Sequence, residues 1–146
     1  MKANTALAPV ERAVGTWTVT GSHPGLPGRT LHGKVTFEHI EGGAFLRMRS
    51  EMEDPELPDG VAIFGTDDDD DACTMLYFDV RGVARRYEVA FHADGFAWSR
   101  DSRKLAQRFR ITIANDARTM EGEGTMKKDG APWEADLRLS YVRVGS

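Results

Sequence analysis

Apolar and polar residues alternate along most of the chain, and the alternation is clearest on either side of the pair Gly42-Gly43. In residues 31–39 the apolar side chains of Val35 and Phe37 alternate with polar ones, and residues 46–53 alternate in the same way. A period of two is typical of a strand with one buried face and one exposed face. Glycine between two such runs supplies the positive φ of a tight turn. The pattern predicts a long β-hairpin over residues 30–53.

The same alternation predicts strands on both sides of this hairpin, separated by turns rich in glycine, proline and aspartate. A short helix is predicted within residues 5–14, because Leu7, Val10 and Val14 are spaced three and four residues apart. The predicted strands cover residues 15–21, 61–66, 72–81, 84–92, 96–100, 107–114, 119–127 and 133–144.

These elements predict a single all-β domain over residues 1–146, with about ten antiparallel strands in a meander. No helical pattern separates the strands, which excludes a βαβ fold. A flat sheet of this length would leave hydrophobic edges open, and closure into an up-and-down β-barrel removes them. A two-sheet sandwich is the alternative. Because a ten-stranded barrel is wider than its side chains can fill, we expect an internal cavity.

Strand phase predicts the side chains that face this cavity. Tyr77, Tyr87 and Tyr141 share the inward phase with Trp98 and Met48. Aromatic rings with one polar tip are suited to orienting a bound molecule, although a barrel core also needs large residues. We predict these five residues as ligand contacts.

Polar residues in the inward phase provide candidate anchors. His39 is predicted either as a polar anchor or general base, or as a hydrogen-bonded histidine at the barrel mouth. Asp79 and Arg85 lie on neighbouring strands and are expected to form an ion pair, because a buried charge must be paired. Without that partner, Arg85 could bind a ligand carboxylate or phosphate.

Two strands carry further expectations. In residues 72–81 both faces are largely apolar, which suggests that the outer face is covered and that the protein forms a homodimer. In residues 133–144 we expect Trp133, Ala135, Leu137, Leu139 and Tyr141 to face inward.

Composition narrows the function classes. The net charge of −4 is more than accounted for by the five aspartates of residues 67–71, so the remainder is near neutral and argues against a nucleic-acid partner. That run lacks the spaced ligands and the glycine of a calcium loop, so no metal site is expected. No run approaches the roughly 20 apolar residues of a membrane-spanning helix. The single cysteine, Cys73, forms no internal disulfide and is expected to be a small buried residue; we expect a cytoplasmic protein.

The motif Gly15-x-Trp17, following a short helix, resembles the start of lipocalins and other calycins. In those barrels the tryptophan plugs the closed end and a late arginine packs over it, which implies Arg138 or Arg143 here. The Gly42-Gly43 hairpin, Tyr77-Phe78-Asp79 and the ending Trp133-x7-Tyr141-x-Arg143 look like a bacterial family of unknown function with a lipocalin-like barrel. The layout is distantly similar to nitrobindin-type haem barrels and fatty-acid-binding barrels. Nitrobindins carry the haem-binding histidine near the C-terminus, whereas the last histidine here is His92, so no haem or other cofactor is expected.

The resemblance implies a cavity that holds a small, mostly apolar molecule. We therefore predict a protein that binds a small apolar or amphipathic ligand. The alternative is a small acid–base enzyme of the isomerase or cyclase type, with His39 beside an inward tyrosine or aspartate.

Overall fold

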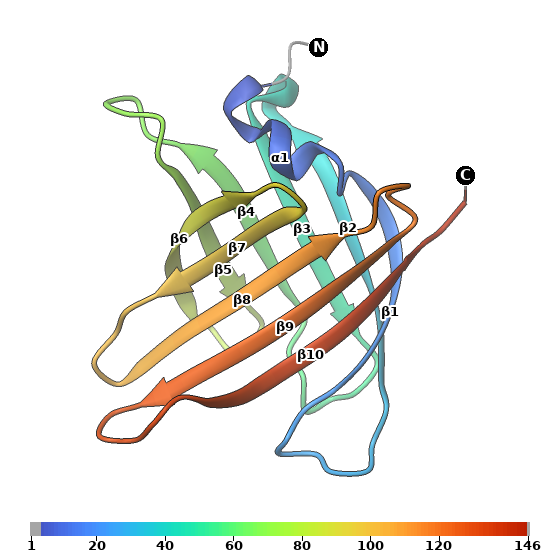
Figure 1. Cartoon of the computed structure of the whole chain (residues 1–146), viewed down its shortest axis with the longest axis vertical. Helices are drawn as coiled ribbons and strands as arrows, with labels where there is room; N and C mark the ends of the chain where they lie inside the picture. The colour runs from blue at the N-terminus through green and yellow to red at the C-terminus, as the bar shows by residue number, and fades with distance from the viewer. Residues whose placement is uncertain (1–3, 146) are drawn as a thin grey trace.

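The chain folds into a closed β-barrel of ten antiparallel strands, described by a computed structural model over residues 4–145 (Figure 1). Each strand pairs with its neighbours in sequence, and β1 pairs with β10 to complete the barrel. The predicted up-and-down barrel is confirmed, and the sandwich is excluded. The strands are β1 (Gly15–Ser22), β2 (Leu31–Ile40), β3 (Phe45–Met52), β4 (Gly60–Thr66), β5 (Cys73–Asp79), β6 (Ala84–His92), β7 (Gly95–Arg100), β8 (Leu105–Ile113), β9 (Thr119–Lys128) and β10 (Glu134–Arg143).

The central hairpin forms as its sequence predicts. Strands β2 and β3 pair over eight rungs, from Gly33 opposite Met52 to Ile40 opposite Phe45. The turn between them is the 3-10 segment η2 (Glu41–Gly43), in which Gly42 and Gly43 have φ values of 65° and 92°. Residues with a Cβ rarely adopt a positive φ, which explains why both positions are glycine.

The N-terminal segment closes one end of the barrel. It consists of η1 (Thr5–Leu7) and α1 (Ala8–Glu11), and it is shorter than the expected range of 5–14. Leu7 of η1 and Val10 of α1 are buried in the core. Asn4 fixes its start, because its side chain accepts a hydrogen bond from the Ala6 amide at 3.0 Å. The helix, the β2–β3 turn and both described chain ends lie at this closed end (Figure 1).

Trp17 and Arg143 connect the chain segments at the closed end through hydrogen bonds. The Trp17 indole is fully buried and donates a hydrogen bond to the Ala13 carbonyl at 2.8 Å. The Arg143 guanidinium lies 4.3 Å from the ring centroid and donates to the carbonyls of Arg12, Val14 and Ala117. Of the two arginines that the resemblance suggested, Arg143 therefore covers Trp17.

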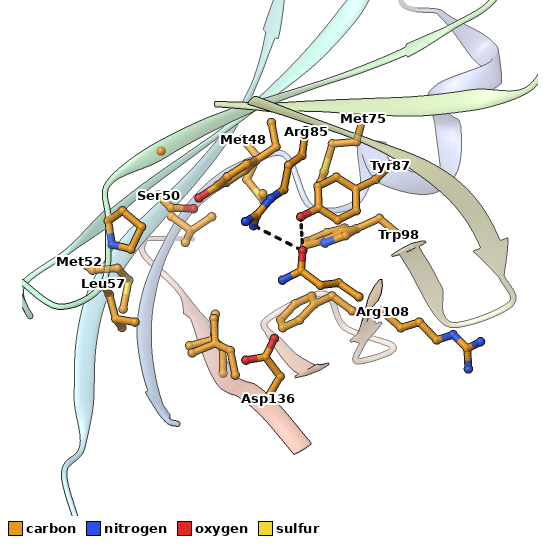
Figure 2. Close-up of a pocket in the computed structure, with 18 of the residues that line it drawn as sticks. Met48, Ser50, Met52, Leu57, Met75, Arg85, Tyr87, Trp98, Arg108 and Asp136 are labelled. Atoms are coloured by element: carbon orange, nitrogen blue, oxygen red, sulfur yellow. Dashed lines mark hydrogen bonds between the residues drawn. The ribbon is translucent and has the colours of Figure 1, made fainter. Parts of the chain in front are cut away.

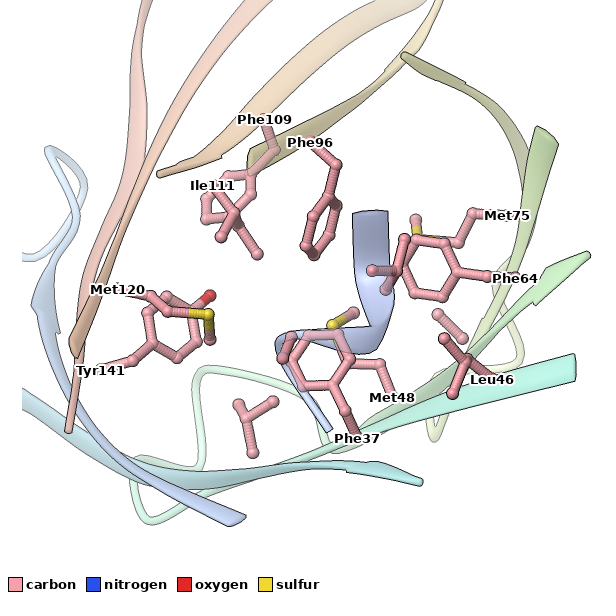
Figure 3. Packing of buried hydrophobic residues seen from close by; sticks show 14 of the residues in the cluster. Phe37, Leu46, Met48, Phe64, Met75, Phe96, Phe109, Ile111, Met120 and Tyr141 are labelled. Carbon is pink, nitrogen blue, oxygen red and sulfur yellow. The ribbon is translucent and has the colours of Figure 1, made fainter. Parts of the chain in front are cut away.

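Aromatic packing fills the half of the barrel next to the helix (Figure 3). The rings of Phe37, Phe64 and Phe96 are almost fully buried and meet with centroid separations of 5.8 to 6.4 Å. Each lies near a connection at the closed end, so the core is concentrated there. Buried apolar area of this kind is the main source of folding free energy.

The last strand departs from the predicted alternation at a β-bulge. Ala135 pairs with Thr125 of β9, but Arg138 pairs with Glu123, so β10 gains one residue relative to its neighbour. An extra residue inverts the phase of everything before it. The expectation that Ala135 faces inward is therefore wrong, and its side chain is exposed.

The same bulge moves Trp133 and Asp136. Trp133 was expected inside, but its ring centroid lies 4.0 Å from the guanidinium carbon of Arg108. Arg108 precedes the buried Phe109 on β8 and therefore faces outward. Asp136, which strict alternation between Ala135 and Leu137 would place outside, lines the barrel interior.

The outer face of β5 is apolar and uncovered in the single chain. Leu76 and Phe78 are 44% and 43% exposed, and Val80 just beyond the strand is 76% exposed. The homodimer stays a prediction. Cys73, on the inner face of the same strand, is buried as expected, and burial raises the pKa of its thiol to about 11. Within residues 4–145, no helix has the length and apolar character needed to cross a membrane.

Candidate functional site

A cavity of about 240 Å³ occupies the half of the barrel away from the helix (Figure 2). It is bounded by the barrel strands and by the loops at the end opposite the helix. Leu57 and Pro58 of the β3–β4 loop form part of its wall. Eight further wall residues have apolar side chains: Val35, Met48, Met52, Met75, Trp98, Phe109, Leu137 and Leu139.

Six of the seven residues predicted as ligand contacts line this cavity. They come from strands β3, β5, β6, β7 and β10, and they are brought together by closure of the barrel. Trp98 stacks on Phe109 with centroids 4.9 Å apart, which makes a flat aromatic wall. The six are Met48, Tyr77, Arg85, Tyr87, Trp98 and Tyr141.

His39 is the exception, because it lies at the closed end. Its phase on β2 is inward, but it lies next to the β2–β3 turn and contacts Glu11 of α1. Nε2 lies 2.6 Å from Oε1 of Glu11, and the imidazole is 17% exposed. Its Nδ1 atom is buried and has no hydrogen-bond partner within residues 4–145. His39 therefore joins the helix to the barrel and does not reach the cavity.

The acid–base enzyme requires a histidine in the cavity. All four histidines lie within the described residues, and none of them is part of the cavity wall. The structure therefore gives this alternative no candidate base of the kind that was expected.

The expected ion pair between Asp79 and Arg85 does not form. Asp79 instead accepts hydrogen bonds from Arg81 at 2.7 Å and from the hydroxyl of Tyr77 at 2.6 Å. The carboxylate is inaccessible to solvent, and the hydrogen bonds from Arg81 hold its pKa well below the usual range. Arg81 follows Asp79 by two residues at the β5–β6 turn, so this local pairing takes precedence over the neighbouring strand.

Arg85 contacts an uncharged partner in place of Asp79. Its Nη1 atom lies 3.5 Å from Oε1 of Gln107, and the Tyr87 hydroxyl donates to the same oxygen at 2.7 Å (dashed lines in Figure 2). Within residues 4–145 no carboxylate oxygen lies within 4.0 Å of the Arg85 guanidinium. The cavity wall therefore carries a cation without a counter-ion.

Gln107 and Asp136 are two of the polar wall residues that the sequence did not predict. Gln107 has the same phase on β8 as Phe109 and Ile111, so its inward position was available from the alternation. Asp136 reaches the wall through the bulge, which the alternation alone does not reveal. Its Oδ1 atom lies 2.9 Å from Nε2 of His23, which ties the β1–β2 loop to this end of the barrel.

The three tyrosines of the wall remain neutral at ordinary pH. Desolvation by burial is the main cause that raises the pKa of Tyr77, Tyr87 and Tyr141 above the usual value near 10, and hydrogen bonding to Asp79 raises that of Tyr77 further. The phenols thus supply hydroxyl groups and no negative charge to the cavity.

Their titration predicts a loss of stability in alkali. A folded-state pKa above the unfolded value stabilises the fold fully below pH 10, and this contribution disappears as the pH rises through the folded-state pKa. We expect the free energy of unfolding in urea to fall above about pH 10, with a shallower fall for Tyr87→Phe. Complete tyrosinate absorbance at about pH 10 in the folded protein would contradict this assignment.

Comparison with known proteins identifies the fold. No protein-family model and no curated protein sequence matches the chain. Among solved structures, Rv2717c from M. tuberculosis is similar with a TM-score of 0.70 and 14% identity, over 99% of this chain and 100% of the other. The S-type phycobiliprotein lyase CPES from Guillardia theta is similar with a TM-score of 0.58 and 14% identity, over 93% and 90%. The chain thus has a lipocalin-like barrel fold, and the likeness to nitrobindin or fatty-acid-binding barrels stays a prediction.

Proposed function

We propose that this protein binds a small apolar or amphipathic molecule inside the barrel. The observation that supports the proposal best is the uneven filling of the interior. Aromatic side chains pack the closed half, whereas the other half keeps a cavity of about 240 Å³ with a largely apolar wall. Ligand pockets combine such walls with a few polar groups that orient the ligand.

The size of the cavity limits the ligand. Pockets for drug-sized molecules have volumes of about 300 to 1,000 Å³, and this cavity lies just below that range. The flat surface of Trp98 on Phe109 suits a ring or a short chain, while the adaptable side chains of Met48, Met52 and Met75 suit variable shapes. A compact ligand is therefore favoured over a long lipid.

Binding can be measured with N-phenyl-1-naphthylamine, a neutral probe whose fluorescence rises in apolar surroundings. We expect the wild-type protein to bind the probe, and Ser50→Phe to weaken binding at least tenfold, because Ser50 lines the cavity and a phenyl ring there occupies the space. Ser99→Phe is the matched control, since Ser99 on β7 lies opposite the exposed Glu88 on the outer face. A wild-type protein that binds no probe, or equal binding by both variants, would refute the proposal.

Two further expectations belong to the proposal. The single cysteine and its burial are compatible with a reducing compartment, which supports a cytoplasmic location. The apolar outer face of β5 supports a homodimer, because exposed apolar patches mark interaction sites.

A further inference from the structure

We propose that the ligand is a monoanionic carboxylic acid, whose carboxylate is bound by Arg85 and Gln107 at the open end of the cavity. This inference rests on the proposed function and adds the chemical class of the ligand. It depends on the charge state of the cavity wall and on the hydrogen-bonding capacity of two side chains.

Among the arginines of the wall, Arg85 is the one that, within residues 4–145, is neither paired with a carboxylate nor placed over an aromatic ring. Arg81 is paired with Asp79, and the carboxylate of Asp136 is hydrogen-bonded to His23. Arg108 reaches the wall from the outer side, where it lies over the ring of Trp133. Arg85 is partly buried and has no carboxylate within 4.0 Å among residues 4–145. Because removing a cation from water without a nearby counter-ion is unfavourable, one negative charge is the complement that the surroundings of Arg85 lack.

Gln107 supplies a second donor next to Arg85. Its Oε1 atom accepts from both the Tyr87 hydroxyl and Arg85, which uses the two acceptor positions of the amide oxygen. The reverse orientation of the amide would direct its NH2 group at the guanidinium, which has no acceptor, so the geometry fixes the assignment. The Gln107 NH2 group and the remaining N–H groups of Arg85 are left as donors without acceptors in these contacts.

Donors of this kind match a carboxylate. The guanidinium is planar and binds carboxylates through two parallel hydrogen bonds, and the amide adds a third donor. The polar group of the ligand would lie here, while its apolar part would contact Met48, Met75 and Trp98. A single cation without a counter-ion favours a monoanion over a phosphate dianion, because the carboxylate of Asp136 lies on the same wall.

Octanoate and 1-octanol test the inference, because they share an apolar chain and differ in charge at neutral pH. Titration calorimetry on the wild-type protein should give at least tenfold tighter binding for octanoate. In Arg85→Gln and Arg85→Met, octanoate binding should weaken 10- to 100-fold, whereas 1-octanol binding should change less than threefold. Arg86→Gln is the matched control, since Arg86 lies next in sequence on the outer face and pairs with Glu88.

Thermal melts of the same variants separate a binding role from a structural role. Removing a cation that has no counter-ion should leave the melting temperature unchanged or raise it. A marked loss of stability in Arg85→Met would show that Arg85 supports the fold, and would overturn the inference.

The outcomes also separate the inference from the proposed function. Equal affinity for octanoate and 1-octanol, with N-phenyl-1-naphthylamine still bound, would overturn the carboxylate and leave the binding function in place. Tighter binding of octyl phosphate than of octanoate would also overturn it, in favour of a phosphate. Failure to bind the neutral probe and both octyl compounds would refute the binding function itself.

Discussion

Replacement of Trp17 by alanine is expected to destabilise the protein by about 3 to 5 kcal/mol, the usual cost of removing a large buried aromatic side chain. Trp17 is fully buried, donates a hydrogen bond to Ala13 and meets the ring of Tyr141 edge-on at 6.5 Å. The variant also removes the ring beneath the Arg143 guanidinium. The melting temperature should fall by about 10 to 15 °C for a chain of this length.

Trp133→Ala is the matched control for this prediction. Trp133 also lies against an arginine, but it is outside the barrel and only partly buried. Loss of one exposed cation–π contact should cost about 1 kcal/mol or less. Urea denaturation of both variants measures the difference, and equal destabilisation would show that Trp17 is not central to the closed end.

Replacement of Gly95 by alanine is expected to cost about 1 to 3 kcal/mol, the range for steric overpacking in a well-packed interior. A Cβ at this position would lie 1.9 Å from the carbonyl oxygen of Ile111 in the neighbouring strand β8. Because that neighbour is backbone, no change of rotamer relieves the clash, and β7 must separate from β8. Loss of pairing here would also disturb Phe96, which follows directly in the core.

Gly25→Ala is the control for Gly95. Its added Cβ would meet only the imidazole of His23, at 3.1 Å from Nδ1, in the exposed β1–β2 loop. A side chain at the surface can move, so the free energy of unfolding should change by less than about 0.5 kcal/mol. Similar effects of the two substitutions would show that the close approach of Gly95 to Ile111 has no energetic importance.

Gly95 also shows how far a sequence signal reaches. The run Ala93-Asp94-Gly95 predicts a hairpin turn, and β6 and β7 are joined there. Gly95 also approaches β8 closely, and that strand begins ten residues later. The turn residues do not predict this contact. Local composition therefore predicts the turn, while the cost of changing its glycine depends on a distant contact.

The candidate site was predictable to a similar extent. Alternation placed Tyr87, Trp98 and Arg85 inside the barrel, and the structure has them on the cavity wall. Alternation gives the face of a strand but not the height along the barrel axis, so His39 was assigned to the cavity although it lies at the closed end. Height depends on the stagger of the strands and on which end the helix covers.

The sequence by itself determined about ten antiparallel strands in a meander, the short helix before them, the central hairpin and the inward phase of most strands. These features are determined by period-two patterning and turn residues, which act between near neighbours in the chain. The tertiary structure alone decided the bulge in β10, the pairing of Asp79 with Arg81 and the isolation of Arg85 beside Gln107. Each of these depends on how neighbouring strands are placed relative to one another, which the alternation within a single strand does not contain.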